Sequence, residues 1–490
     1  MKKSNVFWFK RDLRLRDNPA LNAALKQPEQ LLLVYVFEPS LLSDAHYDNR
    51  HWRFVAESLA DMNDELQAHN AKILVVTAEV QSFFERLQNY LSIQKVFSTE
   101  ETGLKITYDR DLGLQKFFDN AGIRWKEFQN NGVIRGRFSR KGWSSAWHRY
   151  MTAKIEIPDF ENAILADLNV LSSLQGHMKD CITDLTSKPH HFQKGGRAEA
   201  LQWMASFFEE RLEFYNRYIS KPQLSRYGCS RLSPYLAWGN LSIREVYHEV
   251  LYIKPKSLFK RQLNAFSSRL RWQSHFIQKF EMEPRMEFEA INKGFLTLSQ
   301  PIVPDFVTAW KQGKTGYPLV DAAMRCVVET GYINFRMRAM VTSFLTHHLF
   351  QHFTMGSAWL ARQFLDFEPG IHYGQFQMQA GFTGTNTVRV YNPTKNAHEH
   401  DAEAVFIKEY VPELAALPAN LAIEPWEVTE MEAQFYDFRY GSDYPNRIVD
   451  IKETRKNAVT KLYALRKSKL ARSERQRILN RHTIIRQTNE

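Results

Sequence analysis

Cysteine is scarce in this chain. Cys181, Cys229 and Cys326 are the only three in 490 residues. Three widely spaced thiols cannot build a disulfide framework, a four-cysteine zinc site or a four-cysteine iron–sulfur cluster. We therefore expect no metal site, and a reducing compartment.

Long hydrophobic runs are also missing. Residues 1–10 have no extended apolar core, and no later run reaches the roughly 20 residues that span a bilayer. We expect a soluble, cytoplasmic protein that is monomeric and does not contact a membrane, associated with the nucleoid if the source is bacterial.

Two glycine-rich phosphate motifs are absent as well. No Gly-x-Gly-x-x-Gly follows the first expected strand, which argues against a dinucleotide site of the Rossmann kind. Gly313-Lys314-Thr315 resembles part of a P-loop, but it lacks the spacing and the preceding strand of that motif.

Positive charge and aromatic side chains are plentiful. The net charge is +11, the pI is near 9.3, and 13% of the residues are aromatic. A polyanion such as nucleic acid is attracted by this charge, although solubility alone is the alternative explanation. The aromatic content suggests large flat cavities or stacking surfaces.

The order of periodic segments predicts an α/β domain followed by an all-α domain. Short β-rich runs alternate with amphipathic helices up to residue 129, which is typical of a doubly wound parallel sheet. The expected strands are 6–9, 31–37, 72–77, 95–98 and 124–128, with helices at 51–69 and 80–91. Residues 130–195 are expected to be a linker, and 196–490 a helical domain with helices at 198–218, 263–280, 319–329 and 340–353 and a basic helical tail at 452–486.

Several polar stretches interrupt these patterns. Residues 8–21 hold alternating charges before Asn18-Pro19, a good helix start, and a charged capping loop would look the same. Residues 135–150 interleave cations with aromatics, which suits nucleic-acid stacking or a docked linker with cation–π contacts. The basic tail fits a solvated helix or an acidic partner such as DNA.

The loop from Gly228 to Ser242 places hydroxyl groups at a helix start near Pro234. That arrangement fits a helix cap or a phosphate cradle. The stretch 366–393 is polar, aromatic and broken by glycine, so we expect a helix end followed by an irregular segment that holds a ligand. Asp366 and Glu368, two positions apart, cannot share one helix face.

Together these motifs resemble the photolyase and cryptochrome family of flavoproteins. The similarity rests on 8–21, on the loop at 228–234, on Gly313-Lys-Thr-Gly-Tyr-Pro-Leu-Val-Asp-Ala-Ala-Met-Arg325, on 331–338 and on Arg389 with Asn392-Pro393. It spans about residues 4 to 465. Cys229 stands where the family has a threonine.

The resemblance implies FAD, bound U-shaped in the helical domain, and UV-damaged DNA as the partner. Arg338 falls on the arginine that pairs with the first acid of the family's Asp-x-Asp, so Asp366 and Glu368 are expected to meet it at the flavin edge. Arg336 and Arg389 are expected at DNA phosphates, and Trp272 at a flipped base. The implied cofactor-binding residues are Ser230, Arg231, Leu232, Ser233, Gln273, Arg338, Asp366, Glu368 and His372.

Three positions depart from the family at the site of chemistry. His372 stands at the position facing flavin N5, where an imidazole could donate to N5 or titrate. Arg269 replaces the lesion-contacting glutamate, and Asn334 replaces the histidine of six-four enzymes, with His275 and His372 as substitutes. The implied catalytic residues are Trp272, Arg269, His372 and Asn334, and they do not choose between a cyclobutane dimer, a six-four photoproduct and no lesion.

The electron and antenna routes also differ from the family. The usual tryptophan chain for photoreduction falls on Phe376, Phe353 and Gln300. We therefore expect another route, through Trp359, Tyr373, Tyr391 or Trp238. Residues 99–111 lack the Asn-Glu pair associated with folate, which leaves a folate, a deazaflavin or no antenna chromophore.

The resemblance leaves three functions open. The leading one is a blue-light DNA photolyase that repairs pyrimidine lesions by electron transfer from reduced FAD. The second is a cryptochrome-type photoreceptor without repair activity, and the third is a flavin-bearing DNA scaffold. The tail, which has no long disordered extension, favours the first over the second.

Overall fold

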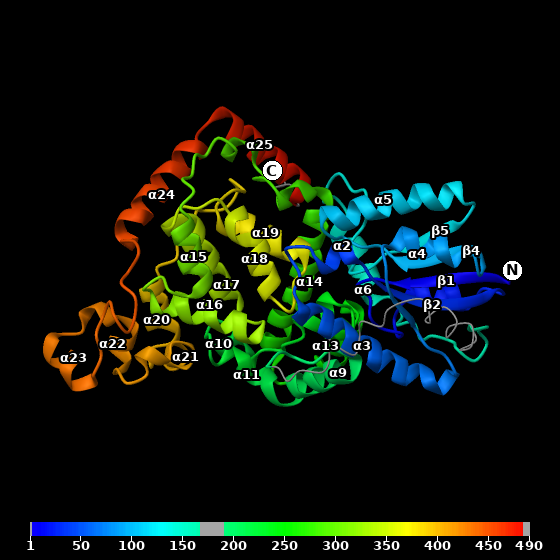
Figure 1. Cartoon of the computed structure of the whole chain (residues 1–490), viewed down its shortest axis with the longest axis horizontal. Coiled ribbons are helices and arrows are strands. Elements are labelled where there is room, and N and C mark those ends of the chain that lie inside the picture. Colours follow the sequence, from blue (N-terminus) through cyan, green and yellow to red (C-terminus); the bar gives the residue numbers. More distant parts are fainter. Residues whose placement is uncertain (1, 167–190, 484–490) are drawn as a thin grey trace.

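The computed structural model describes residues 2–166 and 191–483. Within these ranges an α/β domain and a helical domain lie side by side, with the N-terminus at the end of the central strand that points away from the helical domain (Figure 1). The rest of the expected linker, with Cys181 and Pro189, lies outside the described residues, as does the end of the basic tail from residue 484.

A five-stranded parallel sheet forms the centre of the α/β domain. Its order is β3-β2-β1-β4-β5, so the direction of winding reverses between β1 and β4. The central strand β1 is buried on both faces from Ser4 onward, which suits its four consecutive apolar residues Val6 to Phe9. The strands are β1 (Lys3–Phe9), β2 (Gln30–Phe37), β3 (Leu74–Thr77), β4 (Ser92–Thr99) and β5 (Arg124–Phe128).

Helices cover both faces of this sheet. Val6 and Trp8 point to one face, where they pack with α4 and α5, whereas Phe7 and Phe9 point to the other, beside α1 and α3. The helices of this region are α1 (Pro19–Leu25), α2 (Pro39–Leu42), α3 (Asn49–Leu66), α4 (Val80–Leu87), α5 (Lys105–Asn120) and α6 (Trp143–Thr152), with a short 3₁₀ turn η1 (Gln67–His69).

The second domain is entirely helical among its described residues. Its first half contains α9 (Arg197–Ser206), η2 (Phe207–Arg211), η3 (Leu212–Phe214), α10 (Tyr215–Tyr218), α11 (Ser225–Gly228), α12 (Ser233–Ala237), α13 (Ile243–Ile253), α14 (Lys260–Met282), η4 (Pro284–Glu287), η5 (Lys293–Phe295) and α15 (Pro304–Gln312). Its second half contains α16 (Pro318–Thr330), α17 (Phe335–Ser343), η6 (Phe344–His348), α18 (Thr354–Gln363), α19 (Pro369–Gln379), α20 (Pro393–His400), α21 (Val405–Tyr410), η7 (Pro412–Leu414), α22 (Ala419–Ile423), η8 (Pro425–Glu427), α23 (Glu430–Tyr436), α24 (Ile451–Arg466) and α25 (Lys469–His482).

The predicted architecture is confirmed, and several local predictions are wrong. All five strands occur within a few residues of their expected positions. The single helix expected at 198–218 is instead broken by a π-helical turn at η2 and a 3₁₀ turn at η3. The helix expected at 340–353 ends in the π-helical turn η6, and Phe350 has a positive φ of 52°, which no regular helix contains. The linker boundaries stay a prediction, although α6 lies within them.

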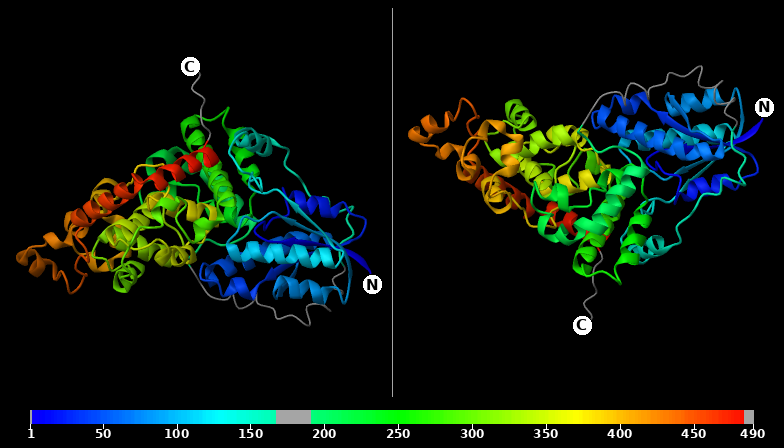
Figure 2. Two further views of the ribbon diagram at one scale, coloured as in Figure 1. Left: turned by 90° about the horizontal axis from the view of Figure 1, so that it is seen from above. Right: turned by 90° about the horizontal axis from the view of Figure 1, so that it is seen from below.

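The alternating charges after β1 bind the two domains together. Arg14 donates to the carbonyl of Gly239 at 3.1 Å, and Asp17 pairs with Arg244 at 2.6 Å, with both of these side chains buried. Asn18 also caps α1, as the sequence predicts. One hydrophobic cluster runs from the sheet into the helical domain, and the molecule is elongated along the direction that joins the two domains (Figure 2).

The cation–aromatic segment expected at 135–150 is a docked linker in the structure. Arg140 is 2% exposed and lies 3.6 Å from the ring centroid of Trp143. Arg271 from α14 likewise lies over Trp147 at 5.8 Å. These rings face the protein, so the docked-linker interpretation accounts for the pattern. In the basic tail, Arg477 and Arg481 of α25 pair with Glu283, which accounts for part of its charge.

Candidate functional site

The predicted pair of Arg338 and Asp366 is present. Arg338 on α17 donates to Oδ2 of Asp366 at 2.9 Å and to the carbonyl of Ile333 at 2.9 Å. Its guanidinium also lies 4.0 Å from the ring centroid of Phe364. The Asp366 side chain is 6% exposed, and its Oδ1 is buried without a hydrogen-bond partner among the described residues. A buried carboxylate oxygen of this kind requires a donor from a ligand or water.

His372 lies next to this pair in the first turn of α19. Its Nε2 is 2.9 Å from the carbonyl of Ser357, which makes Nε2 the protonated nitrogen and Nδ1 an acceptor. Burial lowers the pKa of His372 to about 3, and the carbonyl of Ser357 opposes that shift. We therefore expect a neutral ring near pH 7, whose remaining nitrogen, Nδ1, is an acceptor and not a donor; the position of His372 opposite flavin N5 stays a prediction.

Glu368 does not join Arg338, and this part of the prediction is wrong. Its side chain accepts from Gly370 N at 3.4 Å as the N-cap of α19, and it lies 3.8 Å from Arg11 of the other domain. Burial raises the pKa of Glu368 to about 7, although Arg11 lowers it. The two acids point to different partners because Asp366 lies in a turn, whereas Glu368 is the extended N-cap residue just before α19 begins at Pro369.

The hydroxyl loop 230–233 stands at the start of α12. Arg231 has a positive φ of 58° and binds Gln193 with its guanidinium, while Ser230 Oγ lies 3.4 Å from Leu232 N. No side chain caps α12 among the described residues, and since Pro234 has no N–H, the amides of Ser233 and Tyr235 are the ones that a phosphate could bind at this end. Burial raises the pKa of Cys229 to about 12, so this thiol is neutral.

Tyr332 brings this loop and the acid–arginine pair together. The guanidinium of Arg231 lies 3.9 Å from the ring centroid of Tyr332, and the guanidinium of Arg338, a residue of α17, lies 5.8 Å from the same centroid. Trp238, after α12, donates its indole N–H to the carbonyl of Leu365 at 3.0 Å. Three segments distant in sequence, 230–238, 332–338 and 364–372, therefore form one site.

Two glycines let α19 approach α14 closely. A Cβ on Gly370 would lie 2.6 Å from Cα of Ile277, and one on Gly374 would lie 2.8 Å from the ring of Phe276. Gln273, one turn before Ile277 on α14, is half-buried and has no hydrogen-bond partner in the described part of the chain.

Exposed residues lie beyond this buried site. Trp272 is 46% exposed on α14, and Arg269, one turn earlier, is exposed on the same helix. Arg389 is also exposed, in the irregular segment after α19. Arg336 is half-buried and donates to Ser220 Oγ at 3.2 Å.

Asn334 is engaged in helix capping. Its Oδ1 accepts from Met337 N at 3.0 Å, and its Nδ2 donates to the carbonyl of Ile219 at 3.3 Å. An amide held at both ends in this way stabilises the start of α17. The catalytic roles expected for Asn334, Arg269, His372 and Trp272 stay predictions.

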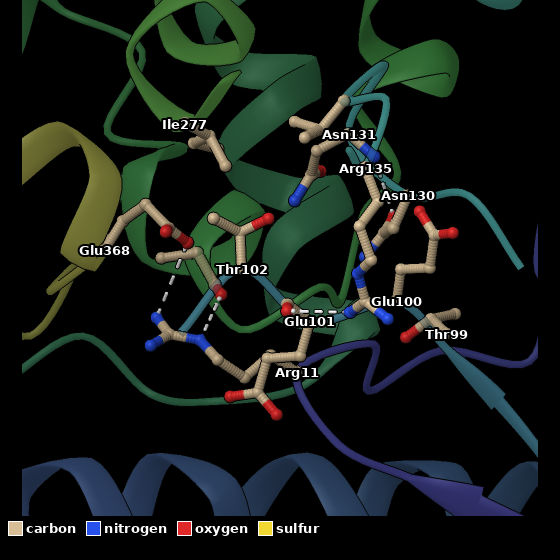
Figure 3. Close-up of a pocket in the computed structure, with 12 residues that line it drawn as sticks. Arg11, Thr99, Glu100, Glu101, Thr102, Asn130, Asn131, Arg135, Ile277 and Glu368 are labelled. Atoms are coloured by element: carbon tan, nitrogen blue, oxygen red, sulfur yellow. Dashed lines mark hydrogen bonds and ion pairs between the residues drawn. The ribbon is translucent and has the colours of Figure 1, made fainter. Parts of the chain in front are cut away.

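A polar crevice opens between the domains at the carboxyl edge of the sheet (Figure 3). It lies where the winding reverses between β1 and β4, the place at which open α/β sheets bind ligands. Arg135 donates to the carbonyl of Glu101 at 3.1 Å, and Arg11 spans from Glu368 to the carbonyl of Ala237. The crevice is lined by Arg11, Thr99, Glu100, Glu101, Thr102, Asn130, Asn131, Val133, Arg135, Ala237, Ile277 and Glu368.

Sequence reasoning missed Arg11 and Tyr332 as parts of these sites. The polar partners of Arg11, which are Glu368 and the carbonyls of Ala237 and Phe367, are more than 200 residues away, so no local pattern indicates them. Tyr332, by contrast, follows Gly331 in a family motif just before α17, and this position could have indicated that Tyr332 belongs to the site.

Comparison with known proteins decides the family. A model described as the DNA photolyase domain matches residues 5–137, and one described as the FAD-binding domain of DNA photolyase matches residues 266–464. The chain belongs to the photolyase and cryptochrome family. The second match covers Arg338, Asp366 and His372, and FAD is the cofactor of this family member.

Named relatives of this family member come from both branches. It is 25% identical to a deoxyribodipyrimidine photo-lyase of Alkalihalophilus pseudofirmus, covering 92% of this chain and 96% of the relative. It is also 25% identical to a cryptochrome DASH of Gloeobacter violaceus, covering 92% and 93%. Among solved structures, a Synechocystis cryptochrome matches with a TM-score of 0.83 at 20% identity, covering 94% of this chain and 99% of that one.

A photolyase structure also matches nearly the whole chain, so the structural matches do not distinguish between the photolyase branch and the cryptochrome branch. A class III photolyase from Agrobacterium tumefaciens matches with a TM-score of 0.80 at 22% identity, covering 96% and 98% of the two chains.

Among the described residues there is no group of histidine, cysteine and acidic side chains fit to hold a metal ion, and no helix is long and apolar enough to cross a membrane.

Proposed function

We propose that the protein is a blue-light-dependent DNA photolyase that repairs UV-induced pyrimidine lesions. The observation that carries this proposal is the exposed indole of Trp272, on the helix that packs against the Asp366–His372 segment. An exposed aromatic face beside a flavin site suits a base that has left the DNA stack. The proposal assigns the exposed Arg389 and the half-buried Arg336 to DNA phosphates, and the exposed Arg269 to the lesion.

The residues of the helical domain fit FAD. The free amides at the start of α12 suit its diphosphate, and the unpartnered Oδ1 of Asp366 suits an N–H donor on the ring. Arg338 neutralises the Asp366 carboxylate, and Nδ1 of the neutral His372 can accept a hydrogen bond from an N–H of the flavin. When bound and reduced, FAD supplies the electron that splits a lesion.

The decisive experiment is a repair assay. Purified protein is reduced chemically and illuminated with blue light in the presence of oligonucleotides that contain a cyclobutane dimer or a six-four photoproduct, single- and double-stranded. We expect restored bases from one lesion type. Absence of product from every substrate, with a normal flavin spectrum, contradicts the photolyase and favours the alternative, a cryptochrome-type photoreceptor without repair activity.

We also infer that the crevice of Figure 3 takes a planar antenna chromophore. Its position at the winding reversal and its polar lining support this inference. A solved relative from Sulfolobus tokodaii, 24% identical with a TM-score of 0.78, is described as holding two FAD molecules. Denaturing the purified protein and quantifying the released pigments per chain tests it, and a single FAD per chain with no other pigment contradicts it.

A further inference from the structure

A buried tyrosine, histidine and aspartate form a hydrogen-bonded row beside the flavin site. The hydroxyl of Tyr373 on α19 lies 2.6 Å from Nε2 of His46. Nδ1 of the same imidazole lies 2.7 Å from Oδ1 of Asp44. Tyr373 is 1% exposed, whereas the Asp44 side chain is 19% exposed, so the row leads from the interior toward solvent.

The directions of these hydrogen bonds follow from the carboxylate. Asp44 Oδ1 also accepts from the backbone N–H of His46 at 2.9 Å. Burial raises the pKa of Asp44, but the hydrogen bonds from His46 outweigh it and hold that pKa below its usual value. Because an ionised carboxylate only accepts, Nδ1 carries the ring proton, and Nε2 accepts from the phenol. The phenol is therefore bonded to a base that can take its proton.

Aromatic contacts connect this row to the flavin site. The ring centroids of Tyr373 and His372 are 5.4 Å apart, and the His46 ring stacks on Phe367 at 5.7 Å with a 13° interplanar angle. Phe367 in turn lies 5.4 Å from His372. The ring of Tyr373 thus lies directly beside the ring of His372, which is the side chain that faces the flavin in the proposed site.

The other candidate donors lack these features. The Trp238 indole N–H donates to a carbonyl, which is not a base, and the Arg11 guanidinium lies 4.6 Å from its ring centroid. A cation so close opposes the positive charge of an oxidised indole. Trp359 has its ring contact with Trp310, at 5.6 Å. The hydroxyl of Tyr391 has no hydrogen-bond partner among the described residues.

We propose that Tyr373 is the electron donor that photoreduces the flavin, with His46 as its proton acceptor and Asp44 as the group that stabilises the resulting imidazolium. This proposal rests on the FAD site proposed above. It gives this chain a donor where Phe376, Phe353 and Gln300 stand in place of the family's tryptophans.

The proposed step moves one electron and one proton away from Tyr373. Tyr373 loses one electron to the light-excited oxidised flavin, its O–H bond breaks, and the proton forms a bond to Nε2 of His46. A neutral tyrosyl radical and an imidazolium paired with Asp44 remain. An external thiolate then gives one electron to the radical and becomes a thiyl radical, while the proton returns from His46 to the phenol oxygen.

The test uses the full-length protein loaded with FAD and illuminated with blue light in the presence of a thiol. Two signals are followed, namely the loss of oxidised-flavin absorption and the tyrosyl radical in samples frozen under illumination, by electron paramagnetic resonance. In Tyr373→Phe we expect photoreduction to slow by about tenfold or more and the radical signal to disappear. Tyr391→Phe and Trp359→Phe serve as matched controls and should keep the wild-type rate.

Two further variants address the proton. His46→Gln removes the base, so photoreduction should slow and lose its rate difference between H₂O and D₂O. Asp44→Asn leaves the packed tyrosine in place and should slow the reaction less. Wild-type rates in Tyr373→Phe, or a radical signal that persists in it at equal FAD content, overturn the proposal, as does a tenfold loss in Trp359→Phe alone.

The same preparation separates this proposal from the photolyase proposal. Wild-type protein whose flavin is reduced with dithionite needs no internal donor, so its repair of lesion-containing oligonucleotides reports the DNA chemistry alone. Failure of that repair contradicts the photolyase and leaves a Tyr373-dependent photoreduction standing. Normal repair with photoreduction unaffected by Tyr373→Phe contradicts the electron-donor role alone.

Discussion

Arg338 holds only one oxygen of Asp366. The guanidinium donates to Oδ2 at 2.9 Å, and Oδ1 stays buried without a partner in the described ranges. The pair therefore supplies a fixed acceptor as well as a neutralised charge, which is what a flavin N–H requires. This geometry makes Asp366 the most direct point at which to test cofactor binding.

We expect Asp366→Asn to weaken FAD binding by about tenfold, equivalent to ~1.4 kcal/mol. The amide keeps the shape of the side chain, but it can neither pair ionically with Arg338 nor offer two acceptor oxygens. Titration of the apoprotein with FAD, followed by flavin fluorescence, gives the affinity. Asp305→Asn, an exposed acid at the start of α15, is the control. Equal affinities for the Asp366 variant and the wild type would show that Oδ1 does not face the ring.

His372 should stay neutral over the range in which histidines ordinarily titrate, about pH 5 to 8. Its pKa is lowered by burial to about 3, from an ordinary 6.5. Nuclear magnetic resonance of protein with labelled histidine, with His372→Gln to assign the signal, should show a flat His372 shift. A midpoint near 6.5 would contradict the buried, carbonyl-bound ring, and would reinstate a titrating group beside the flavin.

Glu368 should make the free energy of unfolding fall as pH rises from about 4.5 to about 7. Burial raises its folded-state pKa to about 7 from 4.5, against the opposing effect of Arg11. The folded protein therefore holds a proton that the unfolded chain has lost, and the slope is about −1.4 kcal/mol per pH unit in the middle of that window.

Glu368→Gln should remove that slope. Chemical denaturation across the window measures it, and Glu65→Gln, an exposed acid of α3, should leave it unchanged. If Glu368→Gln and the wild type show parallel pH profiles, the carboxyl group is ionised throughout and its burial is less complete than the structure indicates.

His51 should make the free energy of unfolding rise with pH, opposite to the effect of Glu368. Its Nε2 donates to the carbonyl of Phe364 at 2.8 Å, and its Nδ1 accepts from Asp48 N at 3.0 Å. Burial lowers its pKa to about 4 from 6.5, so its stabilising contribution is complete above 6.5 and is lost as pH falls toward 4. In His51→Gln, acid denaturation should take up about one proton fewer, as measured by the pH dependence of unfolding. An unchanged proton uptake would contradict this assignment.

The sequence predicted the layers of the fold well because those depend on local periodicity. All five strands and α14 and α16 follow from alternation or from a helical stripe. The π-helical turns at Phe207–Arg211 and Phe344–His348 were missed because they interrupt an amphipathic pattern without any glycine or proline to indicate the break.

The site was predicted as far as the family motifs reach. The Arg338–Asp366 pair could be predicted because both residues lie within recognisable family motifs, and the structure confirms it. The partner of Glu368 could not be predicted, because Arg11 belongs to the other domain and meets it only after the domains pack. The bond between His46 and Tyr373 joins residues 327 positions apart, and no spacing rule in a single sequence reports such a contact.

The exposed cation Arg389 should contribute to DNA affinity without regard to sequence. It lies in the irregular segment after α19, and its side chain has no ion-pair partner in the described part of the chain. Replacing it with alanine should weaken binding to undamaged and lesion-containing duplexes alike. Loss of one phosphate contact should also reduce the slope of log K against log salt concentration by about 0.9.

Fluorescence anisotropy at several salt concentrations measures both quantities. Lys116→Ala is the matched control, since Lys116 is an exposed cation on α5 of the other domain and should change neither value. Trp272→Ala separates the two kinds of contact, because loss of a stacking surface should weaken binding to damaged DNA and leave the salt slope as it was. Equal losses in Arg389→Ala and Lys116→Ala would mean that net charge alone attracts the DNA, and that the helical domain has no specific phosphate contact at Arg389.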